Sequence, residues 1–151
     1  MTTKSILFIL LTATAAFILP SCTKDVEVIV DSSLPQGAFS SSKTGSIVSQ
    51  NDTNSKGAVN VGTDSKGTNF VKLGSDFSTV LATGTVTVYL STSMVFVADP
   101  GNGNPNLKLI GTVAKNGEQY LKLASAPDAK FTHLILWCGS ANVPFGYASL
   151  K

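Results

Sequence analysis

The chain carries little charge, and this scarcity limits the partners that it can bind. It contains no arginine, and its 11 lysines and 9 acidic residues give a formal net charge of +2 over 151 residues. The lysines are spaced singly, so they form no basic stripe of the kind that phosphate backbones require. We therefore expect no nucleic-acid partner. With 43% hydrophobic and 13% charged residues, the composition fits one compact domain and an additional segment.

Reactive side chains are also scarce. His133 is the only histidine, and Cys22 and Cys138 are the only cysteines. The sequence has no CxxCH haem-attachment motif, no glycine-rich phosphate loop and no pair of neighbouring carboxylates. Because no group of ligands has metal-site spacing, we expect no metal site. Hydrolase and nucleotide-binding functions are therefore disfavoured.

What is present begins with an N-terminal segment typical of an export signal. Lys4 precedes two apolar runs, residues 6–11 and 17–19, which together are shorter than a membrane-spanning helix. They end in Leu19-Pro20-Ser21-Cys22, which resembles the lipobox of bacterial lipoproteins. The alternative is an ordinary signal peptide in which Cys22 has no role.

The lipobox resemblance implies a membrane-anchored protein. Residues 1–21 are then the signal peptide, and Cys22 is the first mature residue, with a thioether-linked diacylglycerol and an N-acyl chain such as palmitate. Several acyl chains hold a protein on a bilayer far better than one chain does. We expect an extracytoplasmic location at the cell envelope, with the outer membrane favoured, and the lipid bilayer as a partner.

The remaining sequence predicts a short tether and one β domain. Residues 22–36 alternate acidic and aliphatic side chains and then break at Pro35, so the ordered domain is expected over residues 37–151. Short apolar runs separated by turn residues are typical of an antiparallel β-sandwich or partly closed barrel, here with roughly eight to ten strands. The runs are residues 38–39, 45–48, 58–61, 69–73, 85–90, 94–97, 107–110, 119–123, 131–138 and 145–150.

Two runs show the period of a half-buried strand. Val86, Val88 and Leu90 alternate with polar or aromatic residues and are predicted to share the core face. In residues 131–138, Leu134, Leu136 and Cys138 point one way, and His133, Ile135 and Trp137 point the other. His133 and Cys138 are therefore not expected to bind the same ion, and His133 is expected to be half-buried beside Trp137.

Four segments between or within these runs have their own predictions. Asn116-Gly117 favours a type I′ turn and hence a hairpin between Val113 and Leu121. Residues 94–97 are interpreted as a core strand. Residues 50–56 are interpreted as a solvated hairpin loop rather than as a site. Residues 99–106 are interpreted as an exposed loop, because the prolines and glycines in them support neither helix nor ladder.

Cys138 supports two interpretations. A lone cysteine on a strand is usually a small buried hydrophobe. In an oxidising compartment, however, a thiol that is not in a disulfide must be buried, ligated or used in redox chemistry. Both interpretations stay open on the residue pattern alone.

Three blocks of sequence resemble the DM-thirteen electron-transfer domain. The most specific block is a hydrophobic strand that ends in Trp137-Cys138 and is followed by Phe145-Gly146-Tyr147-Ala148-Ser149-Leu150 at the C-terminus. Residues 84–91 and 110–120 match the family pattern as well, and the resemblance covers roughly residues 37–151. The chain departs from many members at Lys43, where they have a histidine, and at residues 82–85, where they have Gly-Pro-Asp.

This resemblance implies a β-rich extracytoplasmic module that is associated with cytochrome-like and DOMON-like domains. Carried over by position, Cys138 is the redox or catalytic residue, acting as a thiol or as a haem ligand, and Trp137, Phe145 and Gly146 frame the cofactor-binding site. The implied cofactor is haem and the implied partner is a cytochrome or another redox protein. The alternative function is a non-catalytic β-sandwich binding module for a small ligand or a partner protein at the cell envelope. A redox or binding module is favoured over a stand-alone enzyme.

Overall fold

Alternating apolar residues build eight strands, which confirms the all-β prediction. The computed structural model describes residues 31–82, 84–98 and 104–151, and in these ranges it contains strands and turns but no helix. The strands are β1 (Ser40–Ser49), β2 (Ala58–Thr63), β3 (Asn69–Leu73), β4 (Val86–Ser91), β5 (Leu107–Thr112), β6 (Gln119–Lys122), β7 (His133–Cys138) and β8 (Val143–Ser149).

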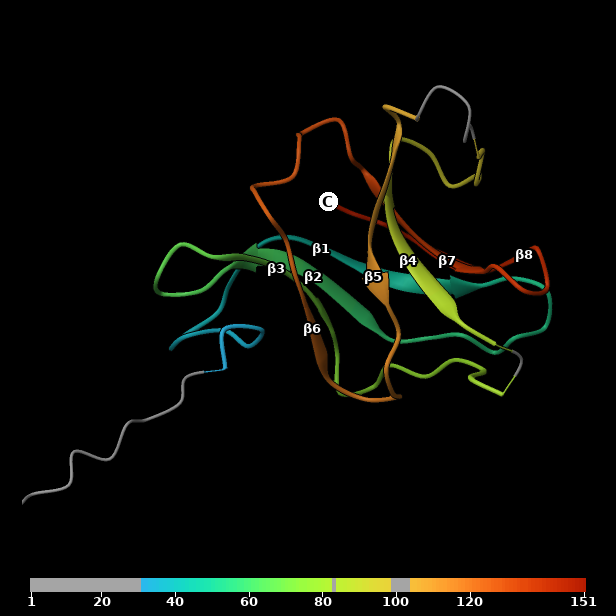
Figure 1. Ribbon diagram of the computed structural model, residues 1–151, viewed down its shortest axis with the longest axis horizontal. Helices are drawn as coiled ribbons and strands as arrows, with labels where there is room; N and C mark the ends of the chain where they lie inside the picture. Colours follow the sequence, from blue (N-terminus) through green and yellow to red (C-terminus); the bar gives the residue numbers. More distant parts are fainter. Residues whose placement is uncertain (1–30, 83, 99–103) are drawn as a thin grey trace, which may run out of the picture. The chain divides into compact units, whose positions relative to one another are not determined.

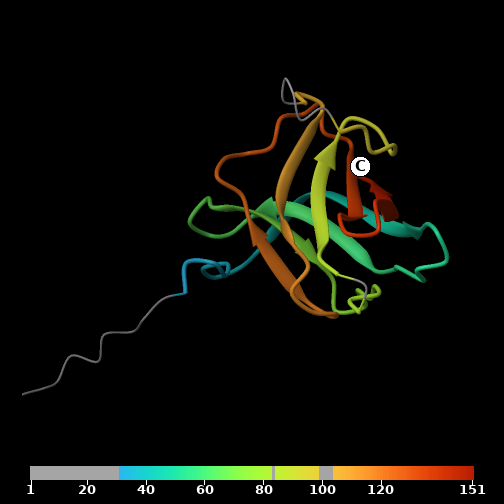
Figure 2. The same ribbon diagram turned by 45° about the vertical axis from the view of Figure 1, so that its right-hand side comes forward.

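The strands form one antiparallel sheet that curves into a nearly closed barrel (Figures 1 and 2). Their order is β5-β4-β7-β8-β1-β2-β3-β6, so β5 and β6 are the two edges. The edges approach each other at Gly111 of β5, where a Cβ atom would lie 3.1 Å from Cδ2 of Leu121 in β6. A glycine at this position lets the barrel close without a steric conflict.

The core face follows the predicted period. Val86, Val88 and Leu90 of β4 are at most 1% exposed and belong to the hydrophobic core. In β7, Leu134, Leu136 and Cys138 are fully buried in the same core, whereas His133 and Trp137 are half-buried on the other face. The face assignment of the two most informative runs is therefore confirmed.

The prediction of a core strand at residues 94–97 is wrong. These residues form a loop after β4, and Met94, Val95 and Val97 are 50%, 59% and 59% exposed. A short apolar run predicts burial only when a neighbouring strand pairs with it, and no strand pairs with this one.

The predicted hairpin between residues 113 and 121 is also wrong. β5 pairs with β4 and β6 pairs with β3, and of the turn pair only Gly117 has positive φ, at 84°. Asn116 is held differently, because its Oδ1 accepts from the N–H of Thr79 at 2.9 Å and its Nδ2 donates to the Thr79 carbonyl at 3.2 Å. The connection between β5 and β6 is thus tied to the segment after β3.

Candidate functional site

Cys138 is the last residue of β7, an interior strand of the sheet, and its side chain lies in the hydrophobic core. It is 0% exposed and is not in a disulfide. Its cross-strand neighbours are Val86 on β4 and Val143 on β8. Sγ lies 3.3 Å from Oγ of Ser140, an exposed residue in the turn that follows. The thiol is therefore surrounded by apolar side chains and contacts a hydroxyl that reaches the surface.

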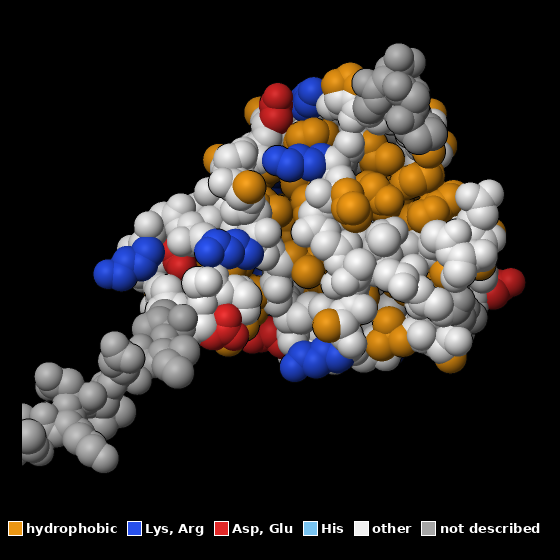
Figure 3. Space-filling model, in the orientation of Figure 1, with side chains coloured by type: hydrophobic (Ala, Val, Ile, Leu, Met, Phe, Trp, Pro, Cys, Tyr) orange, Lys and Arg blue, Asp and Glu red, His pale blue; other side chains and the backbone are white. Residues whose placement is uncertain are grey.

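Trp137 lies on the outer face of the same strand. Its ring stacks on Phe96 with a centroid separation of 3.9 Å and an interplanar angle of 13°, and Phe96 makes an edge contact with Tyr89 at 5.1 Å. The Thr87 hydroxyl donates to the Trp137 carbonyl at 2.9 Å. Phe96 comes from the loop after β4, so the apolar run that is not a strand supplies the ring that covers Trp137. The space-filling view shows hydrophobic side chains gathered over β4, β5 and this loop (Figure 3).

Phe145 and Gly146 take different positions relative to Cys138. Phe145 is 3% exposed and lies in the same core cluster as Cys138. It falls where the β7–β8 register shifts, between the pairs Trp137↔Pro144 and Leu136↔Gly146. Gly146 instead lies against β1, where a Cβ atom would be 2.8 Å from the carbonyl oxygen of Val48. Gly146 therefore sets how closely β8 packs on β1, and the structure groups Phe145 but not Gly146 with the thiol.

A cluster of buried hydroxyl groups supports Phe145, and sequence reasoning missed it. Thr53 is 8% exposed, and its hydroxyl donates to the Phe145 carbonyl at 2.6 Å. The hydroxyl of Ser55 contacts Thr53 at 2.8 Å and Thr79 at 2.7 Å. Because Thr53 gives its one hydroxyl proton to Phe145, Ser55 must donate to Thr53. The predicted hairpin at residues 50–56 is confirmed, because this segment connects the antiparallel strands β1 and β2, but the prediction that it is solvated is wrong at Thr53 and Ser55.

The local sequence explains how this polar loop turns inward. Asn51, Asp52 and Asn54 have φ values of 52°, 53° and 53°. Asparagine and aspartate occupy this left-handed region more readily than other residues with a Cβ atom. Three such residues bend the chain tightly enough to direct Thr53 into the barrel.

The surroundings of Cys138 differ from those that a haem ligand needs. An axial ligand needs an open side of its sulfur large enough for the porphyrin plane, whereas Cys138 is fully buried with apolar neighbours on both adjacent strands. A cavity of about 270 Å³ lies beside Val143 and Phe145, but its lining does not include Cys138. The described residues therefore do not fit a haem at Cys138 unless this end of the core opens.

Other candidate ligands lie elsewhere. His133 is half-buried on the outer face of β7, where its Nδ1 lies 2.9 Å from the Thr132 hydroxyl. Met94 is half-exposed in the loop after β4. Within the ranges that the structure covers, no three His, Cys, Asp or Glu side chains gather closely enough to hold a metal ion.

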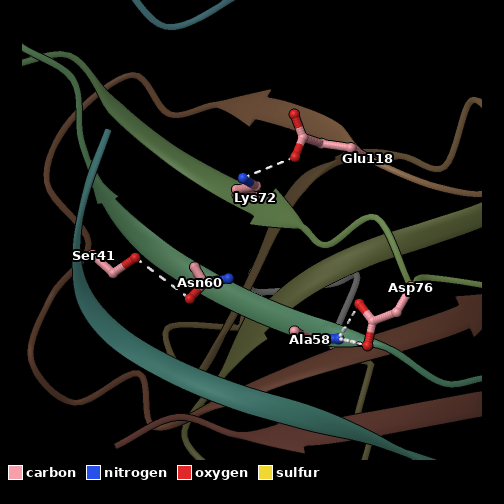
Figure 4. A network of polar contacts seen from close by, with 6 residues as sticks. All are labelled: Ser41, Ala58, Asn60, Lys72, Asp76 and Glu118. Carbon is pink, nitrogen blue, oxygen red and sulfur yellow. Dashed lines mark hydrogen bonds and ion pairs between the residues drawn. The ribbon is translucent and has the colours of Figure 1, made fainter. Parts of the chain in front are cut away.

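The β1–β3 side of the barrel is polar by comparison (Figure 4). Nζ of Lys72 lies 2.8 Å from Oε2 of Glu118, and this hydrogen bond lowers the pKa of Glu118 and raises the pKa of Lys72. The Ser41 hydroxyl contacts Asn60 at 3.4 Å, and the Asp76 carboxylate accepts from the N–H of Ala58 at 3.0 Å. Exposed pairs of this kind contribute little to stability.

Asp64 is a buried carboxylate that organises the turn between β2 and β3. It is 6% exposed and accepts backbone N–H bonds from Gln36 at 2.8 Å and from Lys66 and Thr68 at 2.9 Å each. The bond from Gln36 is the largest cause of the lowered pKa of Asp64. Gln36, which the sequence places in the tether, is thus fastened to the domain.

The predicted lipidation site belongs to the part of the chain before residue 31. Cys22 lies outside the described residues. Among the residues that are described, no helix combines the length and the apolar character needed to cross a membrane.

The fold and the site define an all-β domain with a buried thiol at the end of the interior strand β7. A family model described as Electron transfer DM13 matches residues 46–150. The chain belongs to this family, as the Trp137-Cys138 block predicts. The comparisons with curated proteins and with solved structures each found no match.

Proposed function

We propose that the protein is an electron-transfer module in which Cys138 is the redox residue. The observation that carries this proposal is the arrangement at the end of β7, where Cys138, with its thiol buried in the core, directly follows Trp137 in the chain, and the ring of Trp137 joins an aromatic stack on the outer face. The membership in a family described as electron transfer supports the same role.

In the form that the packing favours, the sulfur itself is oxidised and reduced. An apolar surrounding penalises a charged sulfur, so the thiol must lose its proton together with its electron. One electron passes to an oxidised one-electron carrier of high reduction potential, and the proton leaves past Ser140 Oγ, 3.3 Å away, to water. The resulting thiyl radical takes one electron from a reduced carrier and one proton from water, which restores the thiol.

The haem-ligand form stays a prediction with its own requirement. It requires the end of the core around Cys138 to open, because Val86 and Val143 flank the residue in this structure. An absorbance spectrum of the full chain, before and after haem titration, tests it. A Soret band that is lost in Cys138→Ser supports ligation, and the absence of a band after titration contradicts it.

We also propose that acylated Cys22 anchors the protein at the extracytoplasmic face of the cell envelope, with the outer membrane favoured. Support comes from the sequence around residues 19–22, which resembles a lipobox. Metabolic labelling with a palmitate analogue tests the anchor. Label that is lost in Cys22→Ala, together with release of the protein from the membrane fraction, supports it, and unlabelled wild-type protein contradicts it.

A binding module is the second candidate function, and a surface hollow favours it. The hollow has a volume of about 580 Å³ and lies between the segment before β1, residues 34–39, and the strands β5 and β6. Its lining includes Leu34, Pro35, Phe39 and Tyr120. Aromatic and aliphatic walls with a few polar groups suit a small organic ligand. This function predicts that a bound ligand changes the NMR chemical shifts of Tyr120, and that the change is the same in the wild type and in Cys138→Ser.

The accessibility of the Cys138 thiol distinguishes a buried redox residue from a thiol that reacts at the surface. In a Cys22→Ser background, we expect Cys138 to resist a maleimide reagent until the chain is unfolded, because the residue is 0% exposed. Electron exchange with an oxidised carrier of high reduction potential should nevertheless depend on Cys138 in the native protein. Native exchange that is equally fast in Cys138→Ser would contradict the proposed function.

A further inference from the structure

The outer surface of β4, of β5 and of the loop that follows β4 is unusually apolar. Of the seven large hydrophobic side chains that are at least 36% exposed among the described residues, four lie here. They surround Phe96, which stacks on Trp137, and Tyr89. We call this surface the apolar face and define it by Tyr89, Met94, Val95, Phe96, Val97 and Leu109; Figure 3 shows hydrophobic side chains concentrated over these elements.

The loop that carries most of the apolar face is held in place. The N–H of Thr92 donates to the Asn106 carbonyl at 3.0 Å, and the N–H of Ser93 donates to the Ser91 hydroxyl at 3.1 Å. The Ser93 hydroxyl donates to the Val95 carbonyl at 3.2 Å, and Asn104 donates to the Val97 carbonyl. The apolar side chains are therefore presented by a hydrogen-bonded loop, although burial would be more favourable for each of them.

The apolar face also lacks charge. The sequence from residue 77 to residue 98 contains no Lys, Asp or Glu. Lys108 lies next to Leu109 in β5, but the two residues are on opposite faces of the strand. Lys108 pairs with core-facing Leu90, whereas Leu109 pairs with outward-facing Tyr89. The β1–β3 side, by contrast, carries the Lys72–Glu118 pair (Figure 4). The apolar face and this ion pair thus lie on different strands of the barrel.

The size of the apolar face indicates what kind of contact it makes. Four side chains exposed by half or more present roughly 400 Å² of surface, whereas a stable protein interface buries about 800 Å² on each partner. The area is therefore too small for a permanent dimer. It suits a transient complex, and electron-transfer encounters are at the small end of the range of interface sizes.

We propose that the apolar face is the docking surface for a one-electron carrier protein whose own contact surface is uncharged, so that the partner's redox centre lies over the Trp137–Phe96 stack. This inference rests on the proposed function of Cys138 and names its partner class and contact surface. The stacked rings of Phe96 and Trp137 fill the space between the docked partner and β7, so the gap that the electron must cross to reach Cys138 is shorter. Neither ring needs to be oxidised. Electrons and protons balance as in the thiol step described above.

The single tryptophan makes docking directly observable. Trp137 is the only tryptophan in the chain, and a haem group that docks over Phe96 should quench its fluorescence by energy transfer. The full chain is titrated with three oxidised haem proteins that differ in the charge around the exposed haem edge. They are cytochrome c with a basic rim, cytochrome b5 with an acidic rim, and a class I c-type cytochrome with an uncharged rim.

We expect the carrier with the uncharged rim to quench Trp137 most strongly. Its half-saturation concentration should change less than about twofold between low salt and 0.5 M salt, because no charge pairs are screened. Val97→Lys and Leu109→Lys should each weaken quenching about tenfold, as expected from losing the burial of one aliphatic side chain. The matched control is Val48→Lys, which replaces an equally apolar residue that is 50% exposed on β1, and it should change quenching less than about twofold.

Several results would overturn the docking surface. They are an absence of quenching by all three carriers, or quenching of Val97→Lys that equals that of the wild type. A dimer in light scattering that Val97→Lys dissociates would assign the face to a second copy, and quenching by brominated lipid vesicles that Val97→Lys removes would assign it to a membrane. Both results would also overturn the proposal.

Electron exchange is measured separately, through the haem absorbance of the carrier. Carriers that quench Trp137 but exchange no electron with the protein would contradict the proposed function and leave the docking surface standing. Exchange that depends on Cys138 but is equally fast in Val97→Lys would overturn the docking surface and leave the proposed function standing.

Discussion

Cys138 and Trp137 are consecutive residues of β7, yet their side chains lie on opposite faces of the sheet. The thiol is fully buried among core residues, and the indole stacks on Phe96 at 3.9 Å on the outside. A strand places alternate residues on opposite faces, so the Trp-Cys pair connects the interior of the barrel to one surface. This connection is the structural basis of the proposed electron-transfer role.

The close packing of β8 on β1 depends on Gly146. We expect Gly146→Ala to lower the free energy of unfolding by about 1–3 kcal/mol, because its Cβ would lie 2.8 Å from the Val48 carbonyl and 3.1 Å from Ile47 Cγ2. Urea unfolding followed by Trp137 fluorescence measures the change. Gly139→Ala is the matched control, since nothing lies within 4 Å of its added Cβ, and equal stability of the two variants would contradict this account.

The buried hydroxyl cluster should contribute to stability through Thr53. Thr53→Val keeps the shape but removes the donor to Phe145 and leaves Ser55 without one acceptor, so we expect a loss of about 1–2 kcal/mol. The Phe145 carbonyl still accepts from the N–H of Gln50 at 3.0 Å, which limits the loss. Ser41→Ala at an exposed site should change stability by less than about 0.5 kcal/mol. A loss for Thr53→Val as small as that of the control would show that the cluster is dispensable.

Acid should weaken the fold partly through Asp64. The pKa of Asp64 is lowered in the folded protein from its ordinary value of 3.8, first by the bond from Gln36. A lowered folded pKa contributes stability that is present above pH 3.8 and is lost as the pH falls through the folded value. In urea unfolding at a series of pH values, wild type should exceed Asp64→Asn at pH 7, and the difference should shrink below about pH 4. Asp52→Asn on the exposed loop is the control, and a wild-type advantage over Asp64→Asn that is independent of pH would contradict the assignment.

The sequence predicted the parts of the fold that depend on local period. Val86, Val88 and Leu90 alternate strictly, and Leu134 and Leu136 share their face with Cys138, so the core side of β4 and β7 followed directly. The run at residues 94–97 has the same composition but lies at the surface. Its exposure could not be predicted, because hydrophobicity indicates burial only when the partner strand is known.

Long-range pairing and polar burial limited the prediction of the site. Asn116-Gly117 has the residues of a hairpin turn, but Asn116 bonds to Thr79, far away in the sequence. Thr53 and Ser55 lie in a run that is typical of a solvated loop, and they are buried because each finds a hydroxyl or carbonyl partner in a segment distant in the sequence. The available sequence signal for the inward turn of this loop was its three asparagine and aspartate residues around Thr53, which adopt left-handed backbone conformations. The Trp137–Phe96 stack likewise depends on a loop conformation that the sequence does not specify.

The most direct test of the central claim is protein-film voltammetry of the full chain and of Cys138→Ser, in a Cys22→Ser background so that Cys138 is the only thiol. The account predicts a one-electron wave whose potential falls with rising pH, since one proton leaves with the electron, and predicts that Cys138→Ser removes it. A wave that persists in Cys138→Ser, or no wave in the parent protein, would contradict the claim that Cys138 is the redox residue.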